Sequence, residues 1–582
     1  MNGENSQSFE LSGKDRKKAF FDAVDIKGLS SKRARAFSAG RVAKLLRLIS
    51  RYLAFTPARV YGLTFLSFGV LTLFLHLGGY YFMDDPRIEA SSLVIGAVFA
   101  LFSVFLIISD KPICMALQSS KIIDFIVFDF FSINRMQNSA QERGLGGAVG
   151  IIFGFLLSVF GFFFPTEYAV LVLLGLIFVT VSMVSPEFPY IFSLLIFPYL
   201  SFVENSTVLF AALIAITVIS FGRKVLIGKR IYSFEIYDFL FLFLIIAVLI
   251  TGVIFGGDGS RRGSLLITVF ALGYIPASNI AVNRRLFDCV SGAIVTASVP
   301  VGLYTVISYA VRLIFYEREP SGEFFDSPEI LAVYLAAVSI FSLYLSVKRS
   351  RIVKKRYYLA VFILSFLALL TTECFAIPIA IFFLILSFLV FRDKRVSPLY
   401  LYLLILLPLL LFLFSDPVLF DISQSMSVFP SLVERRDALL SSLSYFADNL
   451  FLGGAAHGAA DSDFSYNVYV GIACRFGILA LMIFLLLLIL RVLHLSVYKK
   501  YFSHSTVNFY VEMTTLASVA ILMFGSYLDV FREPLMVYFF VAVFATGSAA
   551  LRVSKKEKEE RLSYYKALGS SDSAAIDVSL KR

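Results

Sequence analysis

Long apolar runs alternate with short polar segments along almost the whole chain. A run of about 17 to 25 residues matches a helix that crosses a bilayer, and about 16 such runs are present. They lie near residues 61–83, 92–109, 146–164, 167–184, 188–203, 206–221, 236–256, 263–281, 285–307, 328–347, 357–372, 375–392, 399–415, 468–494, 507–527 and 535–552. Lys121, Asp124 and Asp129 interrupt the segment from Pro112 to Ile133, which favours an interfacial helix or a re-entrant piece there. We therefore expect an all-α, polytopic transmembrane helical bundle with about 14–16 spans.

Composition supports the same class of protein. The 582 residues are 58% hydrophobic and 16% charged, with a mean hydropathy of +0.83. A soluble core cannot bury that much apolar surface, so membrane lipids are expected partners. The four cysteines stand singly in apolar sequence, which predicts neither a disulfide framework nor a metal site: they are Cys114, Cys289, Cys374 and Cys474.

The net charge of +11 is concentrated in the two tails. Residues 1–51 hold 12 Lys and Arg against five Asp and Glu, and the tail from Arg552 holds eight against five. The net charge therefore reflects the membrane topology of the chain and gives no reason to expect a nucleic-acid partner. We expect a basic cytoplasmic segment at 1–55 and a charged cytoplasmic tail at 554–582. The basic positions from Arg41 to Arg51 fit either a helix on anionic headgroups or a positive-inside signal alone.

Lys and Arg in short loops accumulate on the cytoplasmic side of membrane proteins. If the N-terminus is cytoplasmic and successive spans alternate in direction, the strongly basic loops of this chain fall on that side. The basic loops that fall inside are those around 223–230, 284–285, 348–356 and 392–395. The loops that fall outside are 256–263, 312–327, 371–373 and the long loop 416–464. Both termini then lie in the cytoplasm.

Six arginines violate this trend because they fall in the outer loops. They are Arg261, Arg262, Arg312, Arg318, Arg435 and Arg436. Phosphate is one group that would compensate them, because guanidinium binds it bidentately. For Arg435 and Arg436 the alternative is a local ion pair with Glu434 or Asp437.

The long outer loop carries a predicted amphipathic helix and a histidine. Leu432 to Phe451 has apolar residues at helical spacing, Pro430 and Ser431 precede it, and a Gly-Gly pair follows it. His457 stands just after small residues, which let backbone approach a ligand closely. It is either a general base for a sugar hydroxyl or a solvated loop histidine without a role.

Two sequence patterns in the outer loops carry a family resemblance. Asn467 is followed by nine residues and then Gly477, and Arg435, a helical run and Gly453-Gly454 lie upstream. Residues 322–332, GEFFDSPEILA, form a second pattern just after an arginine. In order and spacing the chain resembles the O-antigen ligase and polysaccharide polymerase superfamily. The resemblance covers roughly residues 188–544, so we expect an O-antigen-ligase-like membrane domain at 188–553, after N-terminal transmembrane helices at 56–187.

The resemblance implies a metal-independent membrane glycosyltransferase without cofactors. Such an enzyme passes a glycan from an undecaprenyl diphosphate carrier to a glycan or lipid acceptor at the outer face of the cytoplasmic (inner) membrane. The diphosphate-binding candidates are Arg261 or Arg262, Arg318, and Arg435 or Arg436, and the catalytic candidates are His457, Tyr466 and Asn467.

The chain departs from the family pattern at three places. Tyr466 stands where the family has histidine, and Glu329 stands where it has asparagine. Cys474 and Arg475 replace the acidic residue that usually precedes the family glycine. Because tyrosine is a poor base near neutral pH, three alternatives stay open. His457 takes over, an acid such as Asp461 or Asp463 acts, or catalysis is altered or lost.

Two other classes of function remain alternatives. A lipid-linked glycan flippase or transporter needs charges inside the spans. Asp238 and Asp288 are the plausible ones, and both lie near the predicted cytoplasmic ends of their spans. A catalytically inactive scaffold of a surface-polysaccharide assembly complex is favoured by the missing histidine.

Overall fold

The computed structural model describes most of the predicted membrane region. The described residues are 44–45, 48, 52, 55–82, 90–113, 115, 145–202, 206–226, 232, 234–255, 258–282, 284–315, 324–325, 327–348, 352–372, 381, 385, 431–454, 467–501, 507–526 and 528–567. Throughout this part of the chain the regular structure is helical, and its one β-type contact is an isolated bridge between Pro57 and Pro112. The prediction of an all-α fold is confirmed for these residues.

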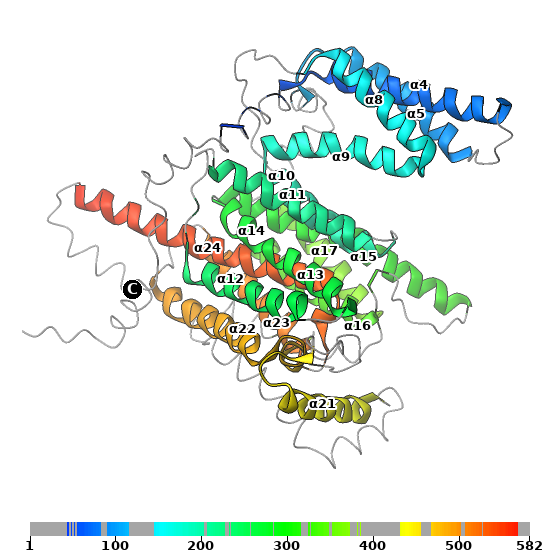
Figure 1. The fold of residues 1–582 in the computed structure, drawn as a ribbon. Helices are drawn as coiled ribbons and strands as arrows, with labels where there is room; N and C mark the ends of the chain where they lie inside the picture. Colours follow the sequence, from blue (N-terminus) through cyan, green and yellow to red (C-terminus); the bar gives the residue numbers. More distant parts are fainter. Residues whose placement is uncertain are drawn as a thin grey trace, which may run out of the picture. The chain divides into compact units, whose positions relative to one another are not determined.

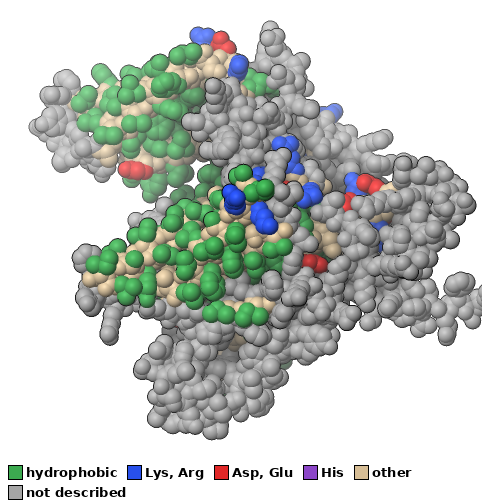
Figure 2. Space-filling model, turned by 180° about the vertical axis from the view of Figure 1, so that it is seen from behind, with side chains coloured by type: hydrophobic (Ala, Val, Ile, Leu, Met, Phe, Trp, Pro, Cys, Tyr) green, Lys and Arg blue, Asp and Glu red, His purple; other side chains and the backbone are tan. Residues whose placement is uncertain are grey.

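Helices occupy the predicted apolar runs except the two near 375–392 and 399–415, of which the structure describes residues 381 and 385 alone. Within the described part, nine helices are long and apolar enough to cross a membrane by length and composition. Four shorter apolar helices accompany them: Ser91–Ile107, Gly147–Phe163, Glu187–Leu200 and Asn508–Phe524. The chain is therefore a multi-pass membrane protein. Large hydrophobic side chains such as Phe74, Phe105 and Leu313 lie exposed, and Figure 2 shows such side chains gathered over broad faces.

The described residues form two compact units. One unit comprises Ser30–Tyr190 and Ile219–Ile231, and it is called here the N-terminal unit. The other comprises Ile191–Val218 and Tyr232–Arg582, and it is called the C-terminal unit. The helix α11 (Ser206–Leu226) contributes its first part to the C-terminal unit and its last turns to the N-terminal unit.

The N-terminal unit is built from α4 (Ala58–Phe82), α5 (Ala90–Ile107), α8 (Gly147–Phe163) and α9 (Thr166–Val184). Glycines let these helices approach closely, because a Cβ at Gly150 would lie 2.6 Å from the Val60 carbonyl oxygen of α4. Buried hydroxyl pairs also join them: Tyr61 bonds Thr180 at 2.8 Å. Small residues and interhelical hydrogen bonds are the usual means of helix association in lipid.

The C-terminal unit packs the remaining helices around a buried centre (Figure 1). In chain order they are α10 (Glu187–Ile196), η2 (Phe197–Phe202), α11, α12 (Ile236–Val248), η3 (Leu249–Ile254), α13 (Asp258–Leu272), α14 (Tyr274–Ile280), α15 (Arg284–Phe315), α16 (Pro328–Lys348), α17 (Ile352–Leu370), α21 (Ser431–Asp448), α22 (Val468–Tyr501), α23 (Asn508–Phe524), η6 (Val530–Arg532) and α24 (Pro534–Ala567). In α16 and α24, 89% and 94% of the most apolar 18-residue stretch is buried, so these two helices lie in the core.

Two polar clusters mark opposite ends of the C-terminal unit. At the end called here the Arg552 end, Arg552 of α24 bonds Asp238 at the start of α12 at 2.9 Å. At the end called the Asp529 end, Asp529 pairs with Arg475 of α22, and the Val468 amide of α22 donates to the Gly525 carbonyl oxygen after α23 at 2.7 Å. Since α12 and α24 each run between these ends in opposite directions, the helices alternate as a polytopic bundle requires.

Candidate functional site

The central feature of the Asp529 end is a break in α22. Gly477 has φ 79° and ψ 178°, a conformation that is not helical and that glycine alone adopts readily. The helix therefore consists of two parts, before and after Gly477. Broken helices of this kind leave backbone groups free of helical partners at the interruption.

The turn that follows α21 fills this break. The Ile478 amide donates to the Leu450 carbonyl oxygen at 2.9 Å, and a Cβ at Gly477 would collide with the carbonyl of Phe451. Gly453 has φ +67°, and a Cβ there would lie 2.6 Å from the Cys474 carbonyl oxygen. The two glycine elements of the sequence pattern therefore meet in space.

The helix α21 lies against α22 near the same break. The Cys474 thiol donates to the Ser442 carbonyl oxygen at 3.2 Å. A Cβ at Gly454 would lie 2.7 Å from the Tyr445 hydroxyl, so the second glycine of the pair makes room for this ring. Burial, and then the neighbouring Cys474, raises the pKa of Tyr445, and the phenol is neutral near pH 7. A helix is present where the amphipathic helix was predicted, and Figure 1 shows it beside α22.

Asn467 has the contacts of a helix cap. Its Oδ1 accepts the amides of Tyr469 at 2.9 Å and Val470 at 3.1 Å, and its Nδ2 donates to the Ser526 carbonyl oxygen at 2.5 Å. The residue is 1% exposed. Asn467 therefore positions the start of α22 and ties it to the segment after α23.

One face of the first part of α22 continues from Asn467 through Gly471 to Arg475, at intervals of four residues. The Arg475 guanidinium pairs with Asp529, whose side chain is 8% exposed. A Cβ at Gly471 would lie 2.7 Å from Asp529 Oδ2, so glycine is needed there to admit the pair. Within the part of the chain that the structure describes, Asp529 Oδ1 has no hydrogen-bond partner.

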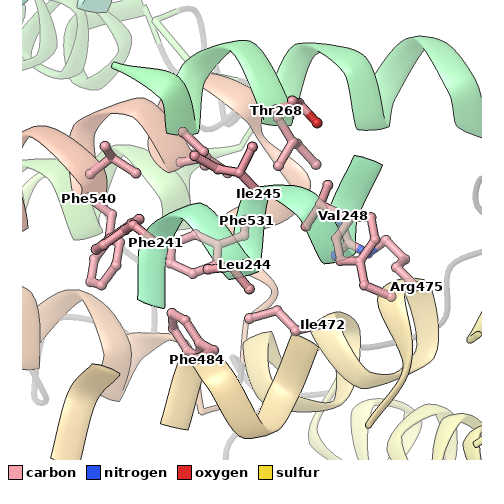
Figure 3. Close-up of a pocket in the computed structure, with 15 residues that line it drawn as sticks. Phe241, Leu244, Ile245, Val248, Thr268, Ile472, Arg475, Phe484, Phe531 and Phe540 are labelled. Carbon is pink, nitrogen blue, oxygen red and sulfur yellow. The ribbon is translucent and has the colours of Figure 1, made fainter. Parts of the chain in front are cut away.

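Beside Arg475 lies an apolar cavity with about 660 Å³ of empty space, a volume that includes open solvent at its mouth. Its lining residues are Phe241, Leu244, Ile245, Val248, Ile267, Thr268, Ala271, Ile472, Arg475, Phe476, Phe484, Phe531, Val537, Phe540 and Val541. Arg475 is the charged member of this set. Figure 3 shows it beside Val248 at one end, with Phe241 and Phe540 toward the other. The cavity thus suits an apolar chain with a polar head group at the Arg475 end.

Near this end of the cavity, α12 continues as a π-helix, η3, which packs closely on α13. A Cβ at Gly252 of η3 would collide with the side chain of Ser264 and lie 3.3 Å from the Phe476 ring. Arg261 and Arg262 lie about one helical turn before Ser264 and are exposed. The structure therefore places these two predicted residues at the Asp529 end, and their role stays a prediction.

The structure describes only some of the other predicted site residues. Arg435 and Arg436 lie in the first half of α21, so their backbone is at the Asp529 end, while their side chains lie outside the described part. The remaining candidates also lie outside the described residues: they are Arg318, His457, Asp461, Asp463 and Tyr466. Their roles stay predictions.

The sequence interpretation missed three charged residues inside the bundle. Arg475 was taken only as a departure from a pattern, and its partner Asp529 was not considered. Arg491 was overlooked, although a charge inside an apolar run is a signal in itself. Its side chain is buried, with Nη2 3.3 Å from the Thr514 hydroxyl and its guanidinium 5.1 Å from the Phe544 ring centroid.

Comparison with known proteins found no matching family model, no matching curated protein and no matching solved structure.

Proposed function

We propose that the chain is a membrane glycosyltransferase of the ligase or polymerase type. It moves a glycan from a polyprenyl diphosphate carrier, of the undecaprenyl kind, to a glycan or lipid acceptor at the outer face of the cytoplasmic membrane. The observation that carries this proposal is the contact between the Gly453 turn and the Gly477 break. It joins two elements of the ligase-like pattern that are distant in the sequence, beside a cavity that ends at an arginine.

The cavity matches the chemistry of such a donor. A polyprenyl chain is entirely apolar, and the cavity is lined by aliphatic and aromatic side chains over most of its length. Its diphosphate needs cations at one end, which Arg475 supplies within the cavity and Arg261 or Arg262 supply nearby. Arg318, and Arg435 or Arg436, are the further candidates from the outer loops.

The distribution of basic residues supports the orientation in this proposal. The start of α15, the end of α16 and the basic tail lie at the Arg552 end. The positive-inside rule places that end in the cytoplasm. The Asp529 end then faces outward, where a translocated lipid-linked glycan is available.

A transporter of lipid-linked glycans is the second candidate, and Arg491 is the observation that favours it. A charged residue inside a span often marks a translocation path. The hydrogen bonds of Arg491 with Thr514 and Ser548, and the close fit of Gly547 against its guanidinium, also suit a fixed anchor between α22, α23 and α24.

One experiment separates the two candidates. The purified chain is placed in liposomes with lipid-linked glycans extracted from the membranes of the source cells and with the matching acceptor fraction. Transferase activity gives a glycosylated acceptor and an equal amount of polyprenyl diphosphate, both measured by mass spectrometry. A transporter moves the donor between leaflets and leaves it intact.

A further inference from the structure

Asp529 is a buried carboxylate whose two oxygens have different surroundings. Its Oδ2 pairs with the Arg475 guanidinium. Its Oδ1 has less than 1 Å² of exposed surface and accepts no hydrogen bond within the described part of the chain. Buried carboxylate oxygens are ordinarily hydrogen-bonded, so an unsatisfied one suggests a group that is completed only when a ligand is bound.

The position of Asp529 ties it to the site. It lies three residues after Ser526, whose carbonyl oxygen accepts the Asn467 side chain at 2.5 Å. It lies two residues before Phe531, which lines the cavity. The Arg532 amide donates to the Asp529 carbonyl oxygen at 3.1 Å and fixes the turn between these contacts. Asp529 is thus held between the start of α22 and the cavity wall.

The ion pair also orients the carboxylate. Arg475 rises from α22 beside Gly471, which leaves space for both side chains. With Oδ2 engaged by the guanidinium, the rotation of the carboxylate is restricted and Oδ1 remains as the acceptor. A general base in glycan transfer needs such an oriented acceptor within hydrogen-bond reach of the attacking hydroxyl.

We propose that Asp529 Oδ1 accepts the proton of the acceptor hydroxyl in the transfer reaction, an inference that rests on the proposed function. The hydroxyl oxygen forms a bond to the anomeric carbon of the donor as its proton passes to Asp529. The bond between that carbon and the diphosphate oxygen breaks, and the electron pair leaves with the polyprenyl diphosphate. The proton is then released to solvent, and no oxidant or further reactant is needed.

The test is Asp529→Asn, which keeps a hydrogen-bond acceptor toward Arg475 and removes the base. We expect kcat for transfer to fall by about 100-fold or more, the usual contribution of a general base. Binding of the lipid carrier, measured with fluorescent polyprenyl diphosphate in detergent as a probe of the donor site, stays within about threefold of the unsubstituted chain. Glu533→Gln is the matched control, because Glu533 is a buried carboxylate four residues later in the same segment.

Three outcomes overturn the inference. One is an Asp529→Asn chain that keeps more than a tenth of the transfer rate. Another is a chain that loses donor binding together with activity, which assigns Asp529 to holding Arg475. A third is an equal loss of activity in Glu533→Gln. If Asp529→Asn does not fold, Asp529→Ser is measured in the same way. An unsubstituted chain without transfer activity contradicts the proposed function itself, which is a different result.

Discussion

Gly453 and Gly477 lie against one another, each with a positive φ: a Cβ built on Gly453 would lie 2.8 Å from the Gly477 amide nitrogen. This contact holds the turn after α21 inside the break of α22. Side chains at either position would separate the two segments. The helix α21, whose first half carries Arg435 and Arg436, is therefore anchored at a defined place on the bundle.

The first prediction concerns Gly477→Ala. The substitution forces an L residue into a conformation at φ 79° and pushes its Cβ into the Phe451 carbonyl. The strain alone costs about 1–3 kcal/mol, so we expect lower thermal stability in detergent and faster proteolysis in the 449–454 turn. Gly222→Ala is the matched control, because a Cβ at Gly222 meets no atom within 4 Å. Equal stability and equal proteolysis of the two variants would show that the contact between the turn after α21 and the break in α22 is not needed.

The second prediction separates capping from catalysis at Asn467. Asn467→Asp keeps the oxygen that accepts the Tyr469 and Val470 amides and loses the donor to Ser526, whereas Asn467→Ala loses both. We expect Ala to destabilise by about 1–2 kcal/mol and Asp by less, with transfer activity following stability. A fully stable Asn467→Asp chain without any activity would instead give Asn467 a direct role in the chemistry.

The third prediction concerns the Arg475 and Asp529 pair. Arg475→Gln leaves the Asp529 carboxylate buried without a cation, and removing one partner of a buried pair costs about 3–5 kcal/mol. The exposure of one fifth of the Arg475 side chain reduces this cost. The double variant Arg475→Gln with Asp529→Asn recovers much of the lost stability. The measurement is the free energy of unfolding of the unsubstituted chain, the two single variants and the double variant. Additive effects of the two substitutions would mean that the pair does not couple.

The fourth prediction tests the orientation of the bundle. Single cysteines at Ser444 and Glu559, both exposed, are introduced after the four native cysteines are replaced by alanine. In intact cells we expect a membrane-impermeant maleimide to label position 444 and to leave position 559 unlabelled until the cells are opened. The opposite pattern would place the Asp529 end in the cytoplasm and exclude transfer at the outer face.

Much of the fold follows from the sequence because the bilayer fixes the length of an apolar helix. The runs near 61–83 and 328–347, for example, are α4 and α16 in the structure. The break in α22 was not predictable in this way, because Gly477 lies inside one continuous apolar run and its conformation depends on the turn packed against it. The split of residues 263–281 into α13 and α14 has the same origin in tertiary contacts.

The candidate site was predictable only where a local pattern carried it. Gly453 and Gly477 belong to the sequence pattern that carried the resemblance, whereas the outer position expected for Arg261 rests on charge alone and stays a prediction. The partner of Arg475 lies 54 residues later in the chain, and no local pattern connects them. Asn467 was expected to act in catalysis, which stays a prediction, and the structure adds the contacts of a helix cap. Such contacts depend on how α22 and α23 end beside each other, which the sequence of either helix does not reveal.

The most direct test of the proposed function is the release of polyprenyl diphosphate by the purified chain in liposomes that hold extracted lipid-linked glycans and acceptor. We predict that the unsubstituted chain and Gly222→Ala release it in step with acceptor glycosylation, and that Gly477→Ala does so at a much lower rate. Donor that crosses the bilayer intact, with no polyprenyl diphosphate released, would contradict the assignment as a glycosyltransferase.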